Sequence, residues 1–306
     1  MRVALLFNPR SGSGRAGRLA GLFAGALADA GHEVTPLTTH DEAGSPRPPL
    51  TPADLDGVGL LAVVGGDGTI HRAGPVAARA GCPIYHVPAG TENLFARHYA
   101  MTREPGQLLR ALARGRTAAM DVAQLVGAGR RHPFLLMASV GPDAGVIHRL
   151  HGSRTGVITQ WSYLRPVLEE LLEPRLPLLS VAVDGHPWLS RARGLLVVGN
   201  SPHYAWGLNP ARAALADDGL LDAAFYPADT IVDMVHWAAR LLLRREGPLE
   251  GTLTRRGRVV EVVASDPRAA LIQMDGEVGP AWSEVEEHGR VVFGIEGTGL
   301  RVLDPR

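Results

Sequence analysis

Short apolar runs alternate with helical patterns over the first third of the chain. The runs predict strands over Val3–Phe7, Glu33–Leu37, Leu60–Val64 and Pro83–Val87. Helical patterns cover Arg15–Ala30 and Thr69–Ala80, and another helix begins within Asn93–Tyr99. Alternating strands and helices, with continuously apolar strands, predict an α/β domain whose mostly parallel sheet is covered on both faces.

The pattern changes near Asp121. Strand-like segments then dominate: Asp121–Val126, Pro133–Val140, Leu178–Val183, Arg193–Val198, Leu221–Tyr226, Val259–Ala264 and Ala270–Met274. Many strands with few helices between them predict an antiparallel β-sandwich. We therefore expect a first domain over residues 1–120 and a second over residues 121–297.

Two helical patterns interrupt the second domain, over Gln160–Leu172 and Thr230–Arg245. Each carries an apolar stripe with a tryptophan, Trp161 or Trp237, which favours core packing over contact with lipid. The segment Leu241–Leu243, followed by Arg244 and Arg245, is the better candidate for contact with a membrane surface.

Composition excludes several classes of protein. The 31 basic side chains balance the 31 acidic ones, so no net charge attracts nucleic acid. Cys82 is the single cysteine, which excludes a disulfide framework and a thiolate metal site. The apolar start is short for a signal peptide, and no segment reaches the roughly 20 apolar residues of a membrane span. We expect a cytoplasmic protein, with peripheral contact at the inner membrane surface left open.

A carboxylate stands inside a glycine-rich loop at the end of the third predicted strand. Gly65-Gly66-Asp67-Gly68-Thr69 follows directly on Leu60–Val64, and Thr69 can cap the next helix. Glycines let backbone N–H groups approach phosphate, but an aspartate repels phosphate unless a cation lies between them. The loop therefore indicates phosphate together with Mg²⁺, although a simple tight turn would use the same residues.

Two further glycine loops follow predicted strands. Gly90-Thr91-Glu92-Asn93 follows the fourth strand, and Gly12–Gly17 fits the dinucleotide pattern G-x-G-x-x-G. Against a dinucleotide site, four residues separate the first strand from the glycines, and the second strand ends in Thr38-Thr39 rather than an acidic residue. Asp41 and Glu42 keep that alternative open. Loops at the carboxyl edge of an α/β sheet favour a nucleotide site.

Every basic side chain apart from histidine is arginine, because the chain contains no lysine. A Walker loop and a protein kinase both need a lysine against the phosphates. The sequence therefore excludes both, and phosphate would have to be held by backbone N–H groups, arginine and Mg²⁺.

The ordered motifs resemble one family over essentially the whole chain. They are Asn8-Pro9 with Ser11-Gly12, Gly65–Thr69, Gly90-Thr91-x-Asn93, Ala216–Asp222 and Met274-Asp275-Gly276-Glu277. This set is similar to the bacterial diacylglycerol kinase and lipid kinase family, which includes sphingosine and ceramide kinases and is distantly related to NAD kinase and phosphofructokinase.

The resemblance implies an active site in a cleft between the two domains, with the chain end, about residues 298–306, returning to the first. It implies Glu277 as general base, Asp275 close by, and Asp67 acting through Mg²⁺. Asp218, with the carbonyls of Leu215 and Leu220, matches a structural Mg²⁺ site. The positions that match ATP contacts are Asn8, Ser11, Gly12, Ser13, Gly14, Thr39, Gly65, Gly66, Asp67, Gly68, Thr69, Ile70, Thr91 and Asn93.

Each downstream motif also has an ordinary structural interpretation. Asp217-Asp218-Gly219 is a common turn before a strand, and Asp275-Gly276 is a common hairpin turn. Two departures from the family pattern stand out. His71-Arg72 replaces the usual Asn-Glu, and Glu92 stands where a small residue is usual.

The sequence thus predicts an ATP- and Mg²⁺-dependent kinase acting on a lipid alcohol. A kinase for a soluble alcohol, a non-catalytic nucleotide or lipid sensor, and an NAD(P) oxidoreductase are the alternatives, in that order. A homodimer is left open, and no nucleic-acid partner is expected.

Overall fold

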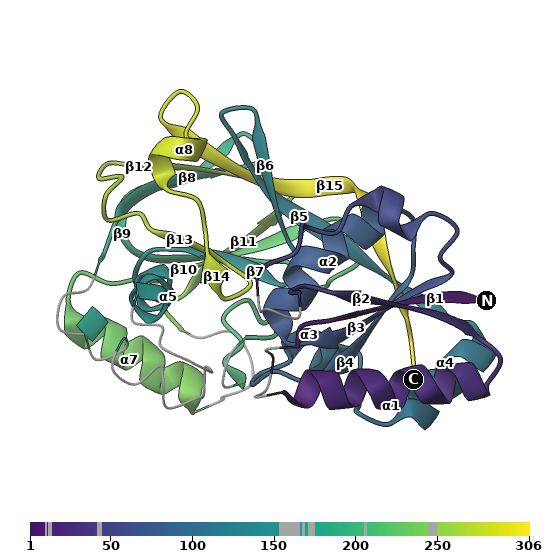
Figure 1. The fold of residues 1–306 in the computed structure, drawn as a ribbon. Coiled ribbons are helices and arrows are strands. Elements are labelled where there is room, and N and C mark those ends of the chain that lie inside the picture. Colours follow the sequence, from purple (N-terminus) through teal and green to yellow (C-terminus); the bar gives the residue numbers. More distant parts are fainter. Residues whose placement is uncertain are drawn as a thin grey trace. The chain divides into compact units, whose positions relative to one another are not determined.

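The chain forms two compact units (Figure 1). Unit 1 contains Met1–Met120 together with Thr298–Arg306, and unit 2 contains Asp121–Gly297. The computed structural model describes residues 1–9, 11, 14–41, 45–152, 166, 169–170, 175–204, 207–243 and 250–306. The helix expected over Gln160–Leu172, with Trp161, therefore lies almost wholly outside the described residues.

Unit 1 is built on a parallel sheet with the strand order β2-β1-β3-β4. The end of β15 adds a parallel neighbour to β4 through the pairing of Val302 with Ile84. All of β3 is buried, as expected for a central strand covered on both faces. The predicted parallel sheet is confirmed. The bounds are β1 (Arg2–Phe7), β2 (Glu33–Thr38), β3 (Leu60–Gly65), β4 (Ile84–Pro88) and β15 (Arg290–Leu303).

Helices cover both faces of this sheet. α1 (Arg15–Asp29) packs against β1, β2 and β3, and α4 (Pro105–Arg114) packs on α1. α2 (Asp67–Arg79) packs against β3 and β4 and contacts α3 (Leu94–His98) and the 3-10 helix η1 (Pro52–Leu55). Figure 1 shows α1 and α4 on one side of the sheet and α2 on the other. Right-handed crossovers produce this arrangement when the strand order reverses within the sheet.

The loops after β3 and β4 approach each other at two glycines. A methyl group added to Gly90 would lie 2.6 Å from the Cα of Gly66. One added to Gly65 would lie 2.5 Å from Oγ1 of Thr69. Side chains do not pack at such distances, so these positions need a residue without Cβ. The glycines therefore allow close contact between the two loops, whatever else the loops bind.

His86 fixes the end of β3 from its buried position in β4. Its Nε2 lies 2.9 Å from the carbonyl oxygen of Gly65, so the neutral ring donates this hydrogen bond from Nε2. The same carbonyl accepts the backbone N–H of Ala89 at 2.7 Å. Burial lowers the pKa of His86 to about 4, which keeps the ring neutral at physiological pH.

Unit 2 is an antiparallel β-sandwich, as predicted. One sheet contains β6-β5-β15-β12-β8 and the first half of β9, and the other contains β14-β13-β7, the second half of β9, β10 and β11. The long strand β9 thus belongs to both sheets. The bounds are β5 (Thr117–Gly127), β6 (Arg130–Phe134), β7 (Met137–Val140), β8 (Leu178–Val183), β9 (His186–Gly199), β10 (Leu221–Pro227), β11 (Leu253–Gly257), β12 (Val259–Ala264), β13 (Ile272–Met274) and β14 (Glu277–Val278).

The core of unit 2 lies between these sheets. Alternate residues of β8, namely Leu179, Val181 and Val183, are buried there together with Leu221 and Phe225 of β10. The period of two follows from the pleat of a strand with one buried face. In the described part of the unit, the named helices are α5 (Pro142–Gly152), α7 (Ile231–Leu242) and α8 (Trp282–Val285).

Helix α7 covers the outer face of the β7–β9–β10 sheet. Trp237 and Leu241 are buried in a cluster with residues of these strands, and Trp237 donates Nε1–H to the carbonyl of Pro227 at 2.7 Å. The interpretation of Trp237 as a core residue is confirmed. Leu241 is not available for surface contact, whereas Leu242 and Leu243 are 52% and 68% exposed. Residues 244–249 lie outside the described residues.

The segment Pro133–Val140, predicted as one strand, is divided between β6 and β7. The carboxylate of Asp275 accepts the backbone N–H groups of Leu135, Leu136 and Met137 at 2.8, 2.8 and 3.1 Å. These donors bond to a side chain instead of a neighbouring strand, so the ladder is interrupted here. The prediction of a single strand was wrong for this reason.

Replacing Gly90 by alanine tests the contact between the loops. We expect Gly90→Ala to lower the free energy of unfolding by about 1–3 kcal/mol, because overpacking forces the backbone of Gly66 away. Gly21→Ala in α1 is the matched control, since its new methyl group meets nothing within 4 Å. It should raise stability by about 0.5–1 kcal/mol. Urea denaturation measures both, and equal effects of the two substitutions would contradict the close approach.

The buried imidazole of His86 predicts a pH dependence of stability. An unfolded histidine titrates near pH 6.5, whereas the pKa of His86 in the folded chain is about 4. Below pH 6.5 the unfolded chain therefore binds a proton that the folded chain does not, so stability falls as the pH falls. The loss relative to His86→Gln should reach about 3 kcal/mol at pH 4, at about 1.4 kcal/mol per pH unit. If the unfolding free energies of wild type and His86→Gln changed in parallel with pH, the predicted effect of the buried imidazole would be refuted.

Candidate functional site

The ends of β1, β3 and β4 lie at one edge of the sheet in unit 1, because the strands are parallel. The chain leaves β1 toward β2 on one side and β3 toward β4 on the other, so the strand order reverses between β1 and β3. Open α/β sheets bind ligands at such a switch point. Asn8, the residue after β1, donates its backbone N–H to the carbonyl of Val64 at 3.3 Å. The loops after β1 and β3 therefore meet there.

A tight turn connects β1 with α1. The backbone N–H of Ser11 donates to the carbonyl of Asn8 at 3.0 Å, and that of Ala16 donates to the carbonyl of Ser11 at 3.3 Å. Gly14 caps the helix with a φ of 83°, a value that favours glycine. Gly12 and Ser13 lie outside the described residues. The turn directs the N-terminus of α1, with its positive dipole, toward the edge where the strands end.

Asp67 is the first residue of α2, where the helix dipole favours a negative charge. The side chain is half-buried, and Oδ1 accepts the backbone N–H of Phe95 at 3.3 Å. The carboxylate therefore ties the loop after β3 to the start of α3. One carboxylate beside a glycine-rich loop is a donor set that suits Mg²⁺, which proteins commonly hold through one or two carboxylates and the substrate's phosphates.

Two side chains near Asp67 that were expected at ATP contacts, those of Thr69 and Ile70, are buried. Thr69 and Ile70 are 3% and 2% exposed, so their side chains belong to the core of unit 1. Any ligand contact from these two positions would have to come from the backbone. Gly66 and Gly68 are half-buried. Thr39 donates its backbone N–H to the carbonyl of Phe7 at 3.1 Å, which ties the end of β2 to β1.

Asn93 shapes the loop after β4. Its Oδ1 accepts the backbone N–H of Gly90 at 2.8 Å, and its Nδ2 donates to the carbonyl of Gly90 at 2.9 Å. The residue itself has a φ of 51° and caps α3. Both the oxygen and the nitrogen of its side-chain amide are hydrogen-bonded to Gly90. We therefore infer that Asn93 shapes the loop. Thr91 is exposed at the tip of the same loop.

The two departures from the family pattern differ in their surroundings. Glu92 forms an ion pair with Arg97 of α3 at 3.6 Å, and its side chain is only 11% exposed. The charge of Glu92 is therefore balanced by Arg97. His71 is half-buried in the second turn of α2, and Arg72 beside it is exposed.

In unit 2, Asp275 and Gly276 form the turn between β13 and β14. Their φ values are 51° and 79°, and Met274 pairs with Glu277 across the turn. Two positive φ angles are typical of a type I′ hairpin, so the hairpin interpretation is confirmed. The Asp275 carboxylate is engaged by three backbone N–H groups of residues 135–137. This side chain therefore anchors the turn on which Glu277 stands half-exposed.

Behind this turn lies a buried carboxylate that the sequence did not single out, Asp143 of α5. It accepts hydrogen bonds from Ser139 Oγ and Tyr204 Oη, both at 2.7 Å, and from Gln273 Nε2 at 3.2 Å. Gln273 in turn accepts the backbone N–H of Gly276 at 2.8 Å. Burial raises the pKa of Asp143. The partners come from separate elements, so no local pattern could have revealed the group.

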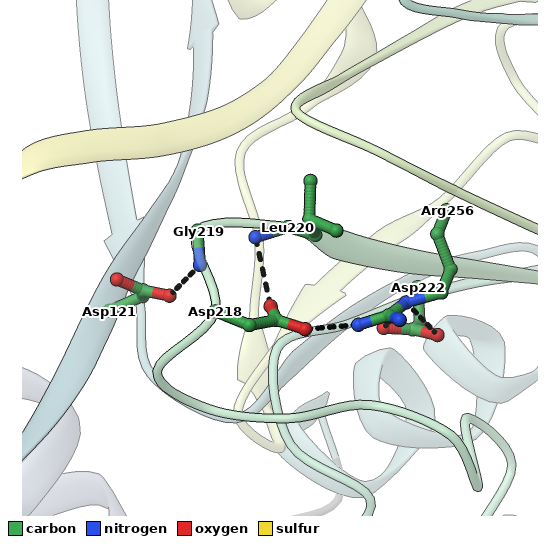
Figure 2. A network of polar contacts seen from close by, with 6 residues as sticks. All are labelled: Asp121, Asp218, Gly219, Leu220, Asp222 and Arg256. Carbon is green, nitrogen blue, oxygen red and sulfur yellow. Dashed lines mark hydrogen bonds and ion pairs between the residues drawn. The ribbon is translucent and has the colours of Figure 1, made fainter.

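Asp218 lies in a polar network with an arginine (Figure 2). Its Oδ1 accepts the backbone N–H of Leu220 at 3.0 Å, and its Oδ2 forms a salt bridge with Arg256. Both oxygens therefore already have partners, and one of these partners is a cation. A structural Mg²⁺ on this carboxylate would face the guanidinium at close range, so the donor set expected from Asp218, Leu215 and Leu220 does not fit the ion. Among the described residues, no three His, Cys, Asp or Glu side chains are grouped to hold a metal.

None of the helices in the described part of the chain has the length and apolar character needed to cross a bilayer. The polar residues described above fall into three sets. They are the loop edge of unit 1 around Asp67, the turn of unit 2 with Glu277 and the network around Asp218.

Comparison with known proteins identifies the family. The model of the diacylglycerol kinase catalytic domain matches residues 2–125. The chain is 27% identical over 263 residues to a diacylglycerol kinase of Mycobacterium tuberculosis, covering 85% of this chain and 84% of that protein. It is 30% identical over 241 residues to a probable lipid kinase, YegS-like, of Pseudomonas fluorescens, covering 77% and 76%.

A solved structure shows the shared fold. The crystal structure of a putative diacylglycerol kinase from Bacillus anthracis matches with a TM-score of 0.71 at 17% identity, covering 99% of this chain and 95% of that one. The motifs, the two-unit fold and the relatives agree. The chain belongs to the bacterial diacylglycerol kinase and lipid kinase family.

Proposed function

We propose that this chain transfers the γ-phosphoryl group of ATP to the hydroxyl group of a diacylglycerol-like lipid in a Mg²⁺-dependent reaction. The observation that carries the proposal is the loop edge of unit 1, where the glycine loops after β3 and β4 touch beside Asp67. Backbone N–H groups and one carboxylate at a switch point suit a magnesium nucleotide. Membership of the family supports a lipid alcohol as acceptor.

In this proposal, unit 1 holds the phosphates largely through its backbone. The loop Gly65–Gly68 offers N–H groups at the N-terminus of α2, and the N-terminus of α1, which Gly14 caps, adds its positive dipole. Asp67 would hold Mg²⁺, which when bound neutralises charge on the phosphates. Because the chain lacks lysine, any cationic side chain at the phosphates would be an arginine.

Glu277 is the proposed general base. It accepts the proton of the lipid hydroxyl as that oxygen attacks the γ-phosphorus, and ADP leaves with the bridging oxygen. Asp275 is a positioning residue in this scheme, because its carboxylate is bound by backbone N–H groups and fixes the turn. The products are a lipid phosphate monoester and ADP.

Three other functions make different predictions. A kinase for a soluble alcohol would transfer phosphate without a lipid phase, and a sensor would bind nucleotide without transferring it. Arg72 in place of a carboxylate is the feature that favours a sensor. An oxidoreductase using Gly12–Gly17 would be stabilised by NADPH rather than by Mg-ATP, which thermal melting distinguishes.

Replacing Asp67 by asparagine tests the magnesium nucleotide. Asparagine keeps an oxygen for the N–H of Phe95 but removes the charge, so the loop should keep its shape. We expect the Kd for Mg-ATP to rise about tenfold or more, the factor that corresponds to about 1.4 kcal/mol. Titration calorimetry measures the change, and Asp29→Asn at the exposed end of α1 is the control. Unchanged affinity in Asp67→Asn would remove Asp67 from the site.

Replacing Glu277 by glutamine tests the reaction itself. The substitution keeps size and hydrogen bonding but removes the proton acceptor, which typically costs about 10²–10⁴ in rate. Binding of Mg-ATP should stay near that of wild type, because Glu277 does not belong to the nucleotide loops. The assay follows labelled phosphate from ATP into diacylglycerol in mixed micelles, and then into a total lipid extract.

The outcomes separate the candidate functions. Glu286→Gln, an exposed carboxylate of unit 2, should retain full turnover. Wild-type protein that binds Mg-ATP but labels no lipid and no soluble alcohol would favour the sensor. Full turnover in Glu277→Gln would leave the proposed kinase in place but assign proton removal to another group.

A further inference from the structure

Hydrogen bonds within unit 2 hold the loop that carries Asp218 (Figure 2). The backbone N–H of Asp121 donates to the carbonyl of Ala216 at 2.6 Å. The Asp121 carboxylate accepts the N–H of Gly219 at 2.7 Å, and Asp218 accepts the N–H of Leu220 at 3.0 Å. Gly219 has a φ of 71°, which completes a sharp turn into β10. The turn thus has protein partners on both sides of Asp218.

Arg256 reaches this loop from the neighbouring strand. It stands on β11 directly opposite Asp222 of β10, and its Nε lies 3.2 Å from Oδ1 of Asp222. The other end of the guanidinium, Nη2, forms the salt bridge with Oδ2 of Asp218. Figure 2 shows the guanidinium between the two carboxylates. One planar group thereby links the start of β10 to the loop that precedes it.

The burial of the three side chains makes this cation structurally important. Asp222 is 8% exposed, Asp218 is 23% exposed and Arg256 is 42% exposed. A carboxylate as buried as Asp222 requires a partner, because an unpaired buried charge is strongly unfavourable. Arginine suits this task since its rigid fork can bond two carboxylates at once and it does not lose its proton.

We propose that the guanidinium of Arg256 is the resident cation of the Asp218 loop, in the position for which the family resemblance implied Mg²⁺. Unit 2 then folds without a divalent ion. The Mg²⁺ requirement of the proposed kinase arises at the nucleotide alone. The statement about the kinase rests on the proposed function, whereas the inference about unit 2 concerns its stability and does not.

The test measures thermal melting of the full chain without nucleotide, in EDTA and in MgCl₂. We expect wild type to melt at the same temperature in both. Arg256→Ala should melt about 4 °C or more lower in EDTA, and Mg²⁺ should recover part of this loss because Asp218 and Asp222 are left without their cation. Adding Asp218→Asn to Arg256→Ala should abolish the recovery.

Arg255→Ala is the matched control, because adjacent residues of a strand project to opposite faces. It should melt near wild type and show no response to Mg²⁺. Arg256→Lys keeps one positive charge and serves if Arg256→Ala does not fold. It should fold in EDTA and melt below wild type, since an ammonium group cannot form the fork.

Three results would overturn the proposal. The first is a rise in the melting temperature of wild type with Mg²⁺ that Asp218→Asn removes, together with Mg²⁺ retained after dialysis as measured by mass spectrometry. The second is an Arg256→Ala protein that melts like Arg255→Ala and gains no response to Mg²⁺. An Arg256→Lys protein that folds only with Mg²⁺ would overturn it as well.

Discussion

The carboxylate of Asp275 is the constraint on which the organisation of unit 2 most depends. It is 9% exposed and gathers three successive backbone N–H groups of the segment between β6 and β7. Hydrogen bonds to a charged acceptor contribute about 1.5–3 kcal/mol each, and losing the acceptor would leave buried donors unsatisfied. The same residue occupies the first position of a turn with positive φ. One side chain therefore separates β6 from β7 and fixes the turn that leads from β13 to Glu277, the first residue of β14.

Much of unit 1 follows from local pattern. Strands buried on both faces are continuously apolar, so β1 and β3 are recognisable from a few consecutive residues, and both lie within one residue of their predicted ends. The Asp-Gly pair likewise predicts the β13–β14 hairpin, because the two residues tolerate positive φ. In these cases the determining interactions lie within a few residues of one another.

The remainder depends on contacts between residues far apart in the sequence. Nothing near Pro133–Val140 indicates that a carboxylate about 140 residues later takes its N–H groups. Asp143 acquires its partners from β7, β13 and the segment with Tyr204. Arg256 lies 38 residues after Asp218. A side chain's neighbours across a sandwich are set by strand pairing, which single-sequence patterns do not specify.

The position of β15 has a consequence for the order in which the two units can fold during synthesis. Leu300, Val302 and Leu303 are buried, and Val302 pairs with Ile84 in a sheet otherwise formed by the first 88 residues. Unit 1 is therefore not a continuous stretch of chain. On the ribosome its sheet cannot be completed until Val302 has been synthesised, whereas the residues of unit 2 emerge earlier. A gene fragment ending at Met120 would lack this strand, and a fusion partner placed directly after Arg306 would lie beside the sheet of unit 1.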